Sequence, residues 1–99
     1  MTFVTTQPEM LSAAAGQLQE IGVALAARNA AVAAPTLGVV PAAADEVSGL
    51  TATQFSLHAA TYQAVSSQAA AIHESFVQIL GVSAGSYAGT EAANALAAS

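Results

Sequence analysis

The segment Gly81-Val82-Ser83-Ala84-Gly85 matches the pattern G-x-S-x-G, which surrounds the nucleophilic serine of many esterases. That chemistry needs a strand before the serine, a helix after it, and an acid and a histidine that activate the hydroxyl. Here the preceding residues have helical periodicity, and no histidine follows Ser83. Gly, Ser and Ala also produce this pattern readily by chance. A small serine hydrolase stays an alternative, and we assign no catalytic residue.

The two histidines and the single arginine are the other candidates for chemistry. His58 and His73 lie 15 residues apart on one predicted helix, so about 22 Å separates them and they cannot share a metal ion. The chain has no Cys, so we expect no metal site and no cofactor. The histidines are read as polar residues at an interface or on the solvent side. Arg28 is either a surface cation that the C-terminal end of a helix favours, or a residue whose guanidinium binds a carboxylate of a partner.

Tyr87 and Glu91 place an aromatic side chain and a carboxylate four residues apart in a Gly- and Ser-rich segment. One helical turn would put both on the same side. From the residues alone, the pair is either a recognition element or an incidental feature of the tail.

Charge excludes several kinds of partner. The net charge is -5 and Arg28 is the only basic residue, so the chain has no basic patch for a nucleic-acid backbone. An anionic membrane surface is disfavoured for the same reason, although a membrane-active amphipathic helical protein stays an alternative. Residues 1–20 contain no Lys or Arg, so we expect no secretory signal peptide. Polar side chains interrupt the longest uncharged stretch, residues 47–73, so we expect no transmembrane segment.

The elements that carry these residues are predicted to be two helices in a single domain, residues 1–99. Pro8 suits the first position of a helix, and Glu9 complements the helix dipole in the first turn. The first helix is predicted over about 8–34, a loop over 35–41 and the second helix over about 42–80. Residues 81–99 are read as a flexible tail. The fold class is all-α, an antiparallel helical hairpin.

Apolar residues on these helices exceed what a hairpin can bury. The first helix has a heptad-like seam: Leu11, Ala14, Leu18, Ile21, Leu25 and Val32. The second helix has two apolar stripes, one formed by Val47, Phe55, Tyr62, Val65, Ala69, Ile72, Phe76 and Ile79, the other by Leu50, Leu57, Ala60, Ala64 and Ala71. We expect the first helix to cover only one stripe, which leaves the other as a binding surface. Two helices also lack the buried area to offset their conformational entropy.

Three signatures give the chain a family resemblance. The start, with Phe3-Val4 and Pro8-Glu9, resembles the mycobacterial PE proteins, which are named for that Pro-Glu pair. The segment Val39-Val40-Pro41-Ala42-Ala43-Ala44-Asp45-Glu46-Val47-Ser48 is similar to the connection between the helices of that family. Tyr87-x-x-x-Glu91 is similar to the Y-x-x-x-D/E export motif of type VII (ESX) substrates. Together the signatures span the chain, and it looks like a short member with the PE domain alone.

The resemblance implies a non-enzymatic subunit that forms a 1:1 heterodimer with a PPE protein, as a four-helix bundle. It implies co-secretion by an ESX system, with Tyr87 and Glu91 as the export signal and the secretion ATPase as a further partner. An EspG-type chaperone would bind through the PPE protein. The complex would be cytoplasmic before export and then secreted or at the cell surface. The expected partner interface comprises Leu11, Leu18, Ile21, Leu25, Leu50, Phe55, Leu57, Tyr62, Val65, Ile72, Phe76 and Ile79.

Overall fold

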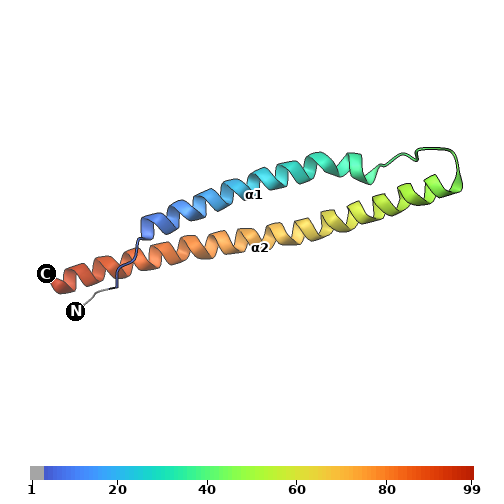
Figure 1. Cartoon of the computed structure of the whole chain (residues 1–99). Helices are drawn as coiled ribbons and strands as arrows, with labels where there is room; N and C mark the ends of the chain where they lie inside the picture. The colour runs from blue at the N-terminus through green and yellow to red at the C-terminus, as the bar shows by residue number, and fades with distance from the viewer. Residues whose placement is uncertain (1–3) are drawn as a thin grey trace. The chain divides into compact units, whose positions relative to one another are not determined.

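The computed structural model describes residues 4–99, which form two helices and no strand. Helix α1 spans Pro8–Leu37 and helix α2 spans Glu46–Ala98. Contacts divide the chain into two units, of which the first joins Met1–Gly22 to His73–Ser99 and the second is Val23–Ile72. In each unit a segment of α1 lies beside a segment of α2 (Figure 1). The predicted all-α class is confirmed, and the two helices form a hairpin.

Helix α1 begins where the sequence predicts. Pro8 occupies its first position, where the missing N–H would have had no partner within the helix. The Gln7 carbonyl accepts hydrogen bonds from the backbone N–H groups of Met10 (3.0 Å) and Leu11 (3.2 Å). Glu9 lies in the first turn, where its charge complements the helix dipole.

The end of α1 differs from the prediction. The helix continues through Pro35 to Leu37 instead of ending near residue 34. Pro35 cannot donate to the carbonyl four residues earlier, but its neighbours close the last turn. The Thr36 hydroxyl donates to the Val32 carbonyl (2.6 Å), and the Gly38 N–H donates to the Ala34 carbonyl (3.0 Å). These bonds carry the helix one turn further than the proline alone indicated.

Helix α2 begins at Glu46, four residues after the predicted start at Ala42. Asp45 is the N-cap, and its Oδ1 accepts a hydrogen bond from the Ser48 N–H at 2.8 Å. Hydrogen bonds from the Ser48 side chain and then from its N–H hold the pKa of the Asp45 carboxyl below its ordinary value. The cap stops the helix from extending back over the three alanines at residues 42–44.

The prediction that α2 ends near Leu80, followed by a flexible tail over residues 81–99, differs from the structure. The helix continues to Ala98 (Figure 1). Gly81, Gly85 and Gly89 lie inside it, each at a cost of about 1 kcal/mol relative to Ala. Alanines alternate with these glycines, and Ala84 is buried against the rest of its unit, with 3% of its surface exposed. Packing and alanine content therefore outweigh the glycine penalty.

The face of α2 that packs in the hairpin is made mostly of small and polar residues, with Val77 and Leu80 as its larger apolar members. In the unit Val23–Ile72, its buried or half-buried positions recur at spacings of three and four: Ala52, Ser56, Ala59, Gln63 and Ser66. In the other unit the same repeat continues with His73, Val77, Leu80, Ala84 and Glu91. We call these ten positions the seam. Small side chains allow two helix backbones to approach closely.

Candidate partner interface

The chain exposes far more surface than a folded monomer of its mass. Among the described residues only Ala15, Ala52, Val77 and Ala84 are buried. The exposed surface is 7483 Å² for a mass of 9.7 kDa, whereas a compact monomer of this mass exposes about 5,100 Å². The excess is about 2,400 Å² on one chain, and obligate interfaces bury about 2,000–5,000 Å² counted over both partners.

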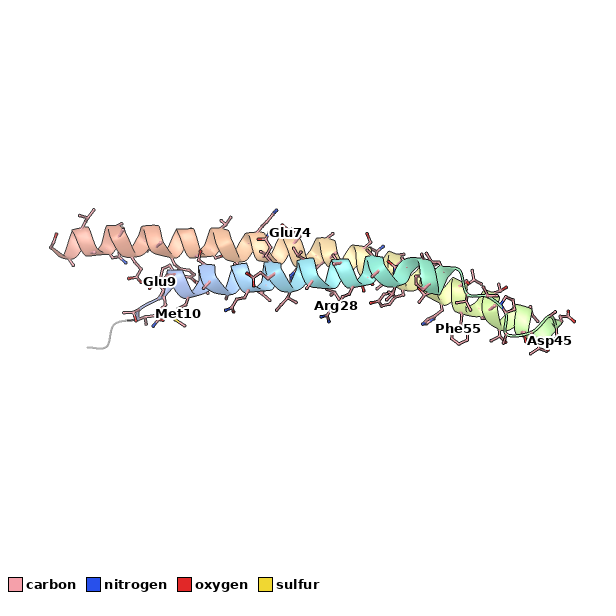
Figure 2. The ribbon with its side chains drawn as sticks, turned by 90° about the horizontal axis from the view of Figure 1, so that it is seen from above. Glu9, Met10, Arg28, Asp45, Phe55 and Glu74 are labelled. Carbon is pink, nitrogen blue, oxygen red and sulfur yellow. The ribbon has the colours of Figure 1, made fainter. Side chains whose placement is uncertain are left out.

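Large side chains, apolar or aromatic except for that of His58, follow one flank of the seam. In the unit Val23–Ile72, each member of this set directly precedes a seam position or the residue that begins the next unit: Phe55, His58, Tyr62, Val65 and Ile72. One residue corresponds to about 100° around a helix, so the set points to one side of the packed face. Phe55 is 62% exposed and Ile72 is 71% exposed. Figure 2 shows Phe55 projecting outward from the ribbon.

The same spacing places Phe76 and Ile79 in the other unit, each directly before a seam residue, and both are exposed. We call the seven residues the large flank: Phe55, His58, Tyr62, Val65, Ile72, Phe76 and Ile79. The other predicted stripe lies on the opposite flank, where Leu57 directly follows seam residue Ser56 and is 58% exposed. Leu50 on this stripe is exposed as well.

The expectation that α1 covers one of the two stripes was therefore wrong. In the unit Val23–Ile72 the packed face lies between the two stripes, and both stripes keep their large side chains exposed. In the other unit only the first stripe continues, and its Phe76 and Ile79 are exposed. The reason is steric: α1 packs on the small residues of the seam, which a count of large apolar residues ignores. The hairpin therefore exposes more apolar surface than the sequence predicts.

The predicted interface residues of α1 fall into two groups. Leu11 and Leu18 are half-buried within their unit, whereas Ile21 and Leu25 are 59% and 55% exposed. Arg28 is exposed and projects away from the ribbon in Figure 2.

An apolar hollow lies on the unit Val23–Ile72. Its volume is about 270 Å³, and Val32, Thr36, Val39, Phe55, His58, Ala59 and Tyr62 line it. Four of these seven are α2 residues, and three of the four belong to the large flank. A hollow of this kind can receive an apolar side chain from a facing helix.

Polar contacts fix which residues of α1 and α2 face each other. In the unit Val23–Ile72, the Tyr62 hydroxyl donates to Asn29 Oδ1 (2.8 Å), and the Gln63 side chain donates to the Asn29 carbonyl (3.0 Å). In the other unit, His73 Nε2 lies 2.7 Å from the Leu18 carbonyl oxygen. A carbonyl only accepts, so this nitrogen carries the proton. Apolar small residues alone specify an alignment weakly, and polar pairs such as these specify it.

Tyr87 and Glu91 lie one turn apart on α2, on the same side of the helix, as the spacing predicts. Tyr87 is 48% exposed and Glu91 is half-buried. Glu91 Oε1 accepts hydrogen bonds from the Thr6 N–H (3.3 Å) and the Thr6 hydroxyl (2.9 Å). The sequence contained no signal for this contact, because Thr6 and Glu91 are separated by almost the whole chain.

Ser83 is half-buried inside α2, with helix on both sides. A nucleophile elbow requires a strand before the serine and a sharp turn at it, so this geometry gives the hydrolase alternative no support. Within the described residues, no three His, Asp or Glu side chains gather as metal ligands. No helix in that part of the chain is long and apolar enough to span a bilayer.

The residues that sequence reasoning missed are the small ones. Ala52, Ser56, Ala59 and Gln63 form the packed face, and none of them belonged to a predicted stripe. Their signal was present as a three-and-four repeat of Ala, Ser and Gln. If this repeat of small residues had been treated as a heptad pattern, it would have predicted which face of the second helix packs in the hairpin.

A helical hairpin that leaves large apolar side chains exposed beside its packed face is typical of helical proteins that bind another protein. Comparison with known proteins makes the class specific. The sequence model of the PE family matches residues 4–94. PE family protein PE13 of Mycobacterium tuberculosis H37Rv is 65% identical over 99 residues, which is the full length of both chains.

Longer proteins match as well. PE family protein PE8 of the same strain is 54% identical over 98 residues, and the PE-PGRS family protein PE_PGRS33 is 55% identical over 95 residues. The chain spans 36% of the length of PE8 and 19% of the length of PE_PGRS33. The chain belongs to the PE family. The Pro8-Glu9 motif begins α1, while Phe3 of the start signature lies outside the described residues.

Proposed function

We propose that this chain is a non-enzymatic subunit that pairs 1:1 with a PPE protein and is exported with it by a type VII (ESX) system. The observation that carries the proposal is the arrangement of the seam: α1 packs on small residues, and Phe55, Ile72 and the other large apolar side chains of both flanks stay exposed. Burial of apolar surface contributes roughly 25 cal/mol per Å², so a surface of this size favours association strongly.

The proposed partner contributes two helices that cover the large flank and complete a four-helix bundle. The rotation of about 100° between the seam and the large flank supports this geometry, because a helix in a four-helix bundle contacts two neighbours on adjacent sides. The apolar hollow beside Phe55 and Tyr62 would receive a side chain of the partner. Arg28 is exposed on α1, and in this proposal its guanidinium binds a carboxylate of the partner.

The export part of the proposal rests on the family and on Tyr87 and Glu91. These residues match the Y-x-x-x-D/E pattern of type VII substrates and share one side of α2. The proposal places the complex in the cytoplasm first, with an EspG-type chaperone bound to the PPE protein. Engagement by the secretion ATPase then leads to the cell surface or the medium.

The pairing is tested with a matched pair of charge substitutions. Ile72 lies on the large flank and is 71% exposed, whereas Ser67 directly follows seam residue Ser66 and is an exposed polar residue on the other flank. Each is changed to Glu, and the chain is co-expressed with a tagged PPE protein encoded beside it. We expect Ile72→Glu to reduce recovery of the complex at least tenfold and Ser67→Glu to leave it unchanged. Recovery of both variants at the wild-type level would reject the proposed interface.

Export is tested separately in a mycobacterial host with an active ESX system. Tyr87→Ala and Glu91→Ala should leave recovery of the complex from cells unchanged and remove the chain from the culture filtrate. Wild-type secretion of both variants would refute the export signal and leave the pairing proposal standing.

A membrane-active protein is the second candidate function, because the exposed apolar flanks could also bind lipid. The single cation argues against it. Flotation of the purified chain with phosphatidylglycerol vesicles distinguishes the two, since the proposed function predicts that the complex with the PPE protein does not float.

A further inference from the structure

The segment before α1 binds the end of α2. Thr6 lies two residues before Pro8, and both of its polar groups contact Glu91: its N–H at 3.3 Å and its hydroxyl at 2.9 Å from Oε1. Thr6 and Glu91 are both half-buried. The two residues are 85 positions apart, and they join opposite ends of the chain within one unit.

Both hydrogen bonds end on the same carboxylate oxygen. Oε1 of Glu91 is occupied twice, while no described residue donates to Oε2. A carboxylate oxygen accepts two hydrogen bonds, which leaves Oε2 available to a donor from another molecule.

Tyr87 lies one turn before Glu91 on the same side of α2 and is 48% exposed. Glu is a flexible side chain that samples several rotamers when it is free. The two bonds from Thr6 hold the Glu91 carboxylate in one orientation beside Tyr87. The Tyr87 ring and Glu91 Oε2 would therefore hold a fixed relative position before a partner binds.

We propose that Thr6 is a positioning residue of the export element, so that the surface read by the secretion machinery is built from both ends of the chain. This inference rests on the proposed role of Tyr87 and Glu91. Thr6 fixes Oε1, and the receptor supplies a hydrogen-bond donor to Oε2 and a pocket for the Tyr87 ring. Preorganisation of this kind increases affinity without adding a contact.

The test uses Thr6→Val and Thr6→Ser in the complex co-expressed with the PPE protein. Val keeps the β-branched shape and removes the hydroxyl, whereas Ser keeps the hydroxyl and removes a methyl group. We expect Thr6→Val to lower the secreted fraction by roughly 3- to 10-fold, the effect of losing one hydrogen bond of typical strength. Thr6→Ser should be secreted like the wild type. Equal secretion of Thr6→Val and wild type would overturn the inference.

Two further readouts separate positioning from a general structural effect. The complex with Thr6→Val should stay intact and melt within about 4 °C of the wild type, because one hydrogen bond contributes only about 1 kcal/mol to stability. Glu91→Asp keeps the charge but shortens the side chain by one bond of about 1.5 Å, so it should lose the Thr6 contact and reduce secretion similarly. The double variant Thr6→Val/Glu91→Asp should be no worse than either single variant, and additive losses would contradict a shared contact.

The export signal itself is checked in the same experiment. Where Glu91→Ala is blocked but Thr6→Val is secreted normally, only the positioning role fails. Where Glu91→Ala is also secreted normally, the export signal fails and the positioning role fails with it.

Discussion

The imidazole of His73 occupies the space beside Gly22 where a Cβ atom would lie. A Cβ built on Gly22 would be 2.8 Å from His73 Cδ2 and 2.9 Å from His73 Nε2. The same nitrogen bonds to the Leu18 carbonyl one turn earlier in α1. His73 therefore requires a glycine opposite it, and the pair fixes how α1 and α2 are aligned in this unit.

Gly22→Ala should destabilise the complex with the PPE protein by about 1–3 kcal/mol, because the methyl group must displace the imidazole from its hydrogen bond. Gly16 is a matched control on the same helix, since nothing lies within 4 Å of a Cβ built there. Gly16→Ala should be neutral or stabilising by thermal melting. His73→Ala should largely cancel the effect of Gly22→Ala in the double variant, and equal destabilisation with and without His73 would contradict the steric explanation.

Gly85→Ala should stabilise the chain by about 0.5–1 kcal/mol. Gly85 lies inside α2, no described glycine has a positive φ, and a Cβ at this position meets no atom within 4 Å. Slower amide hydrogen exchange over residues 81–92 would report the gain. Faster exchange there would mean that this segment is not helical in solution.

The hydrogen bond between Tyr62 and Asn29 should make a small contribution to the free energy of unfolding. The Tyr62 hydroxyl donates to Asn29 Oδ1 at 2.8 Å on the exposed edge of the packed face. A double-mutant cycle with Tyr62→Phe and Asn29→Ala should give a coupling of about 0.5–1 kcal/mol. Urea unfolding of the complex measures it, and zero coupling would show that the bond is not formed in solution.

The Asp45 cap should depend on pH. Its folded-state pKa lies below the ordinary value of 3.8, so its contribution is present above that value and is lost as the pH falls through the folded-state pKa. The Ser48 amide proton shift, followed by NMR, should titrate with a midpoint below 3.8. Asp45→Asn should keep the cap and abolish this titration, whereas Asp45→Ala should lose both. A midpoint at or above 3.8 would contradict the hydrogen bond.

Particular residues show how far the sequence could predict the fold. Pro8 and Glu9 marked the start of α1 correctly, because a proline at the first helical position acts through local geometry alone. Pro35 and Gly81 led to helix ends that were predicted too early. The cost of a proline or a glycine in a helix is local, whereas the hydrogen bonds and packing that outweigh this cost depend on the whole unit. Asp45 is a cap with a standard spacing to Ser48 and could have placed the start of α2.

The interface was harder to predict than the helices. Large residues such as Phe55 and Ile72 were identified as partner-facing, and their exposure is consistent with that role. The seam was not predicted, because Ala52 and Ser56 are small and contribute little to a hydrophobic pattern. Close packing of two helix backbones nevertheless depends on such small side chains. The Thr6–Glu91 contact could not be predicted, because no periodic pattern links residues that far apart.

The central claim is that another chain covers the large flank, and cysteine labelling tests it most directly. The natural chain contains no Cys, so Ile72→Cys and Ser67→Cys each introduce a single thiol. We expect a maleimide to label both variants in the chain alone. In the complex with the PPE protein, Cys at position 72 should be labelled at least tenfold more slowly, and Cys at position 67 should be unchanged. Equal labelling of both thiols in an intact 1:1 complex would show that the partner does not cover the large flank.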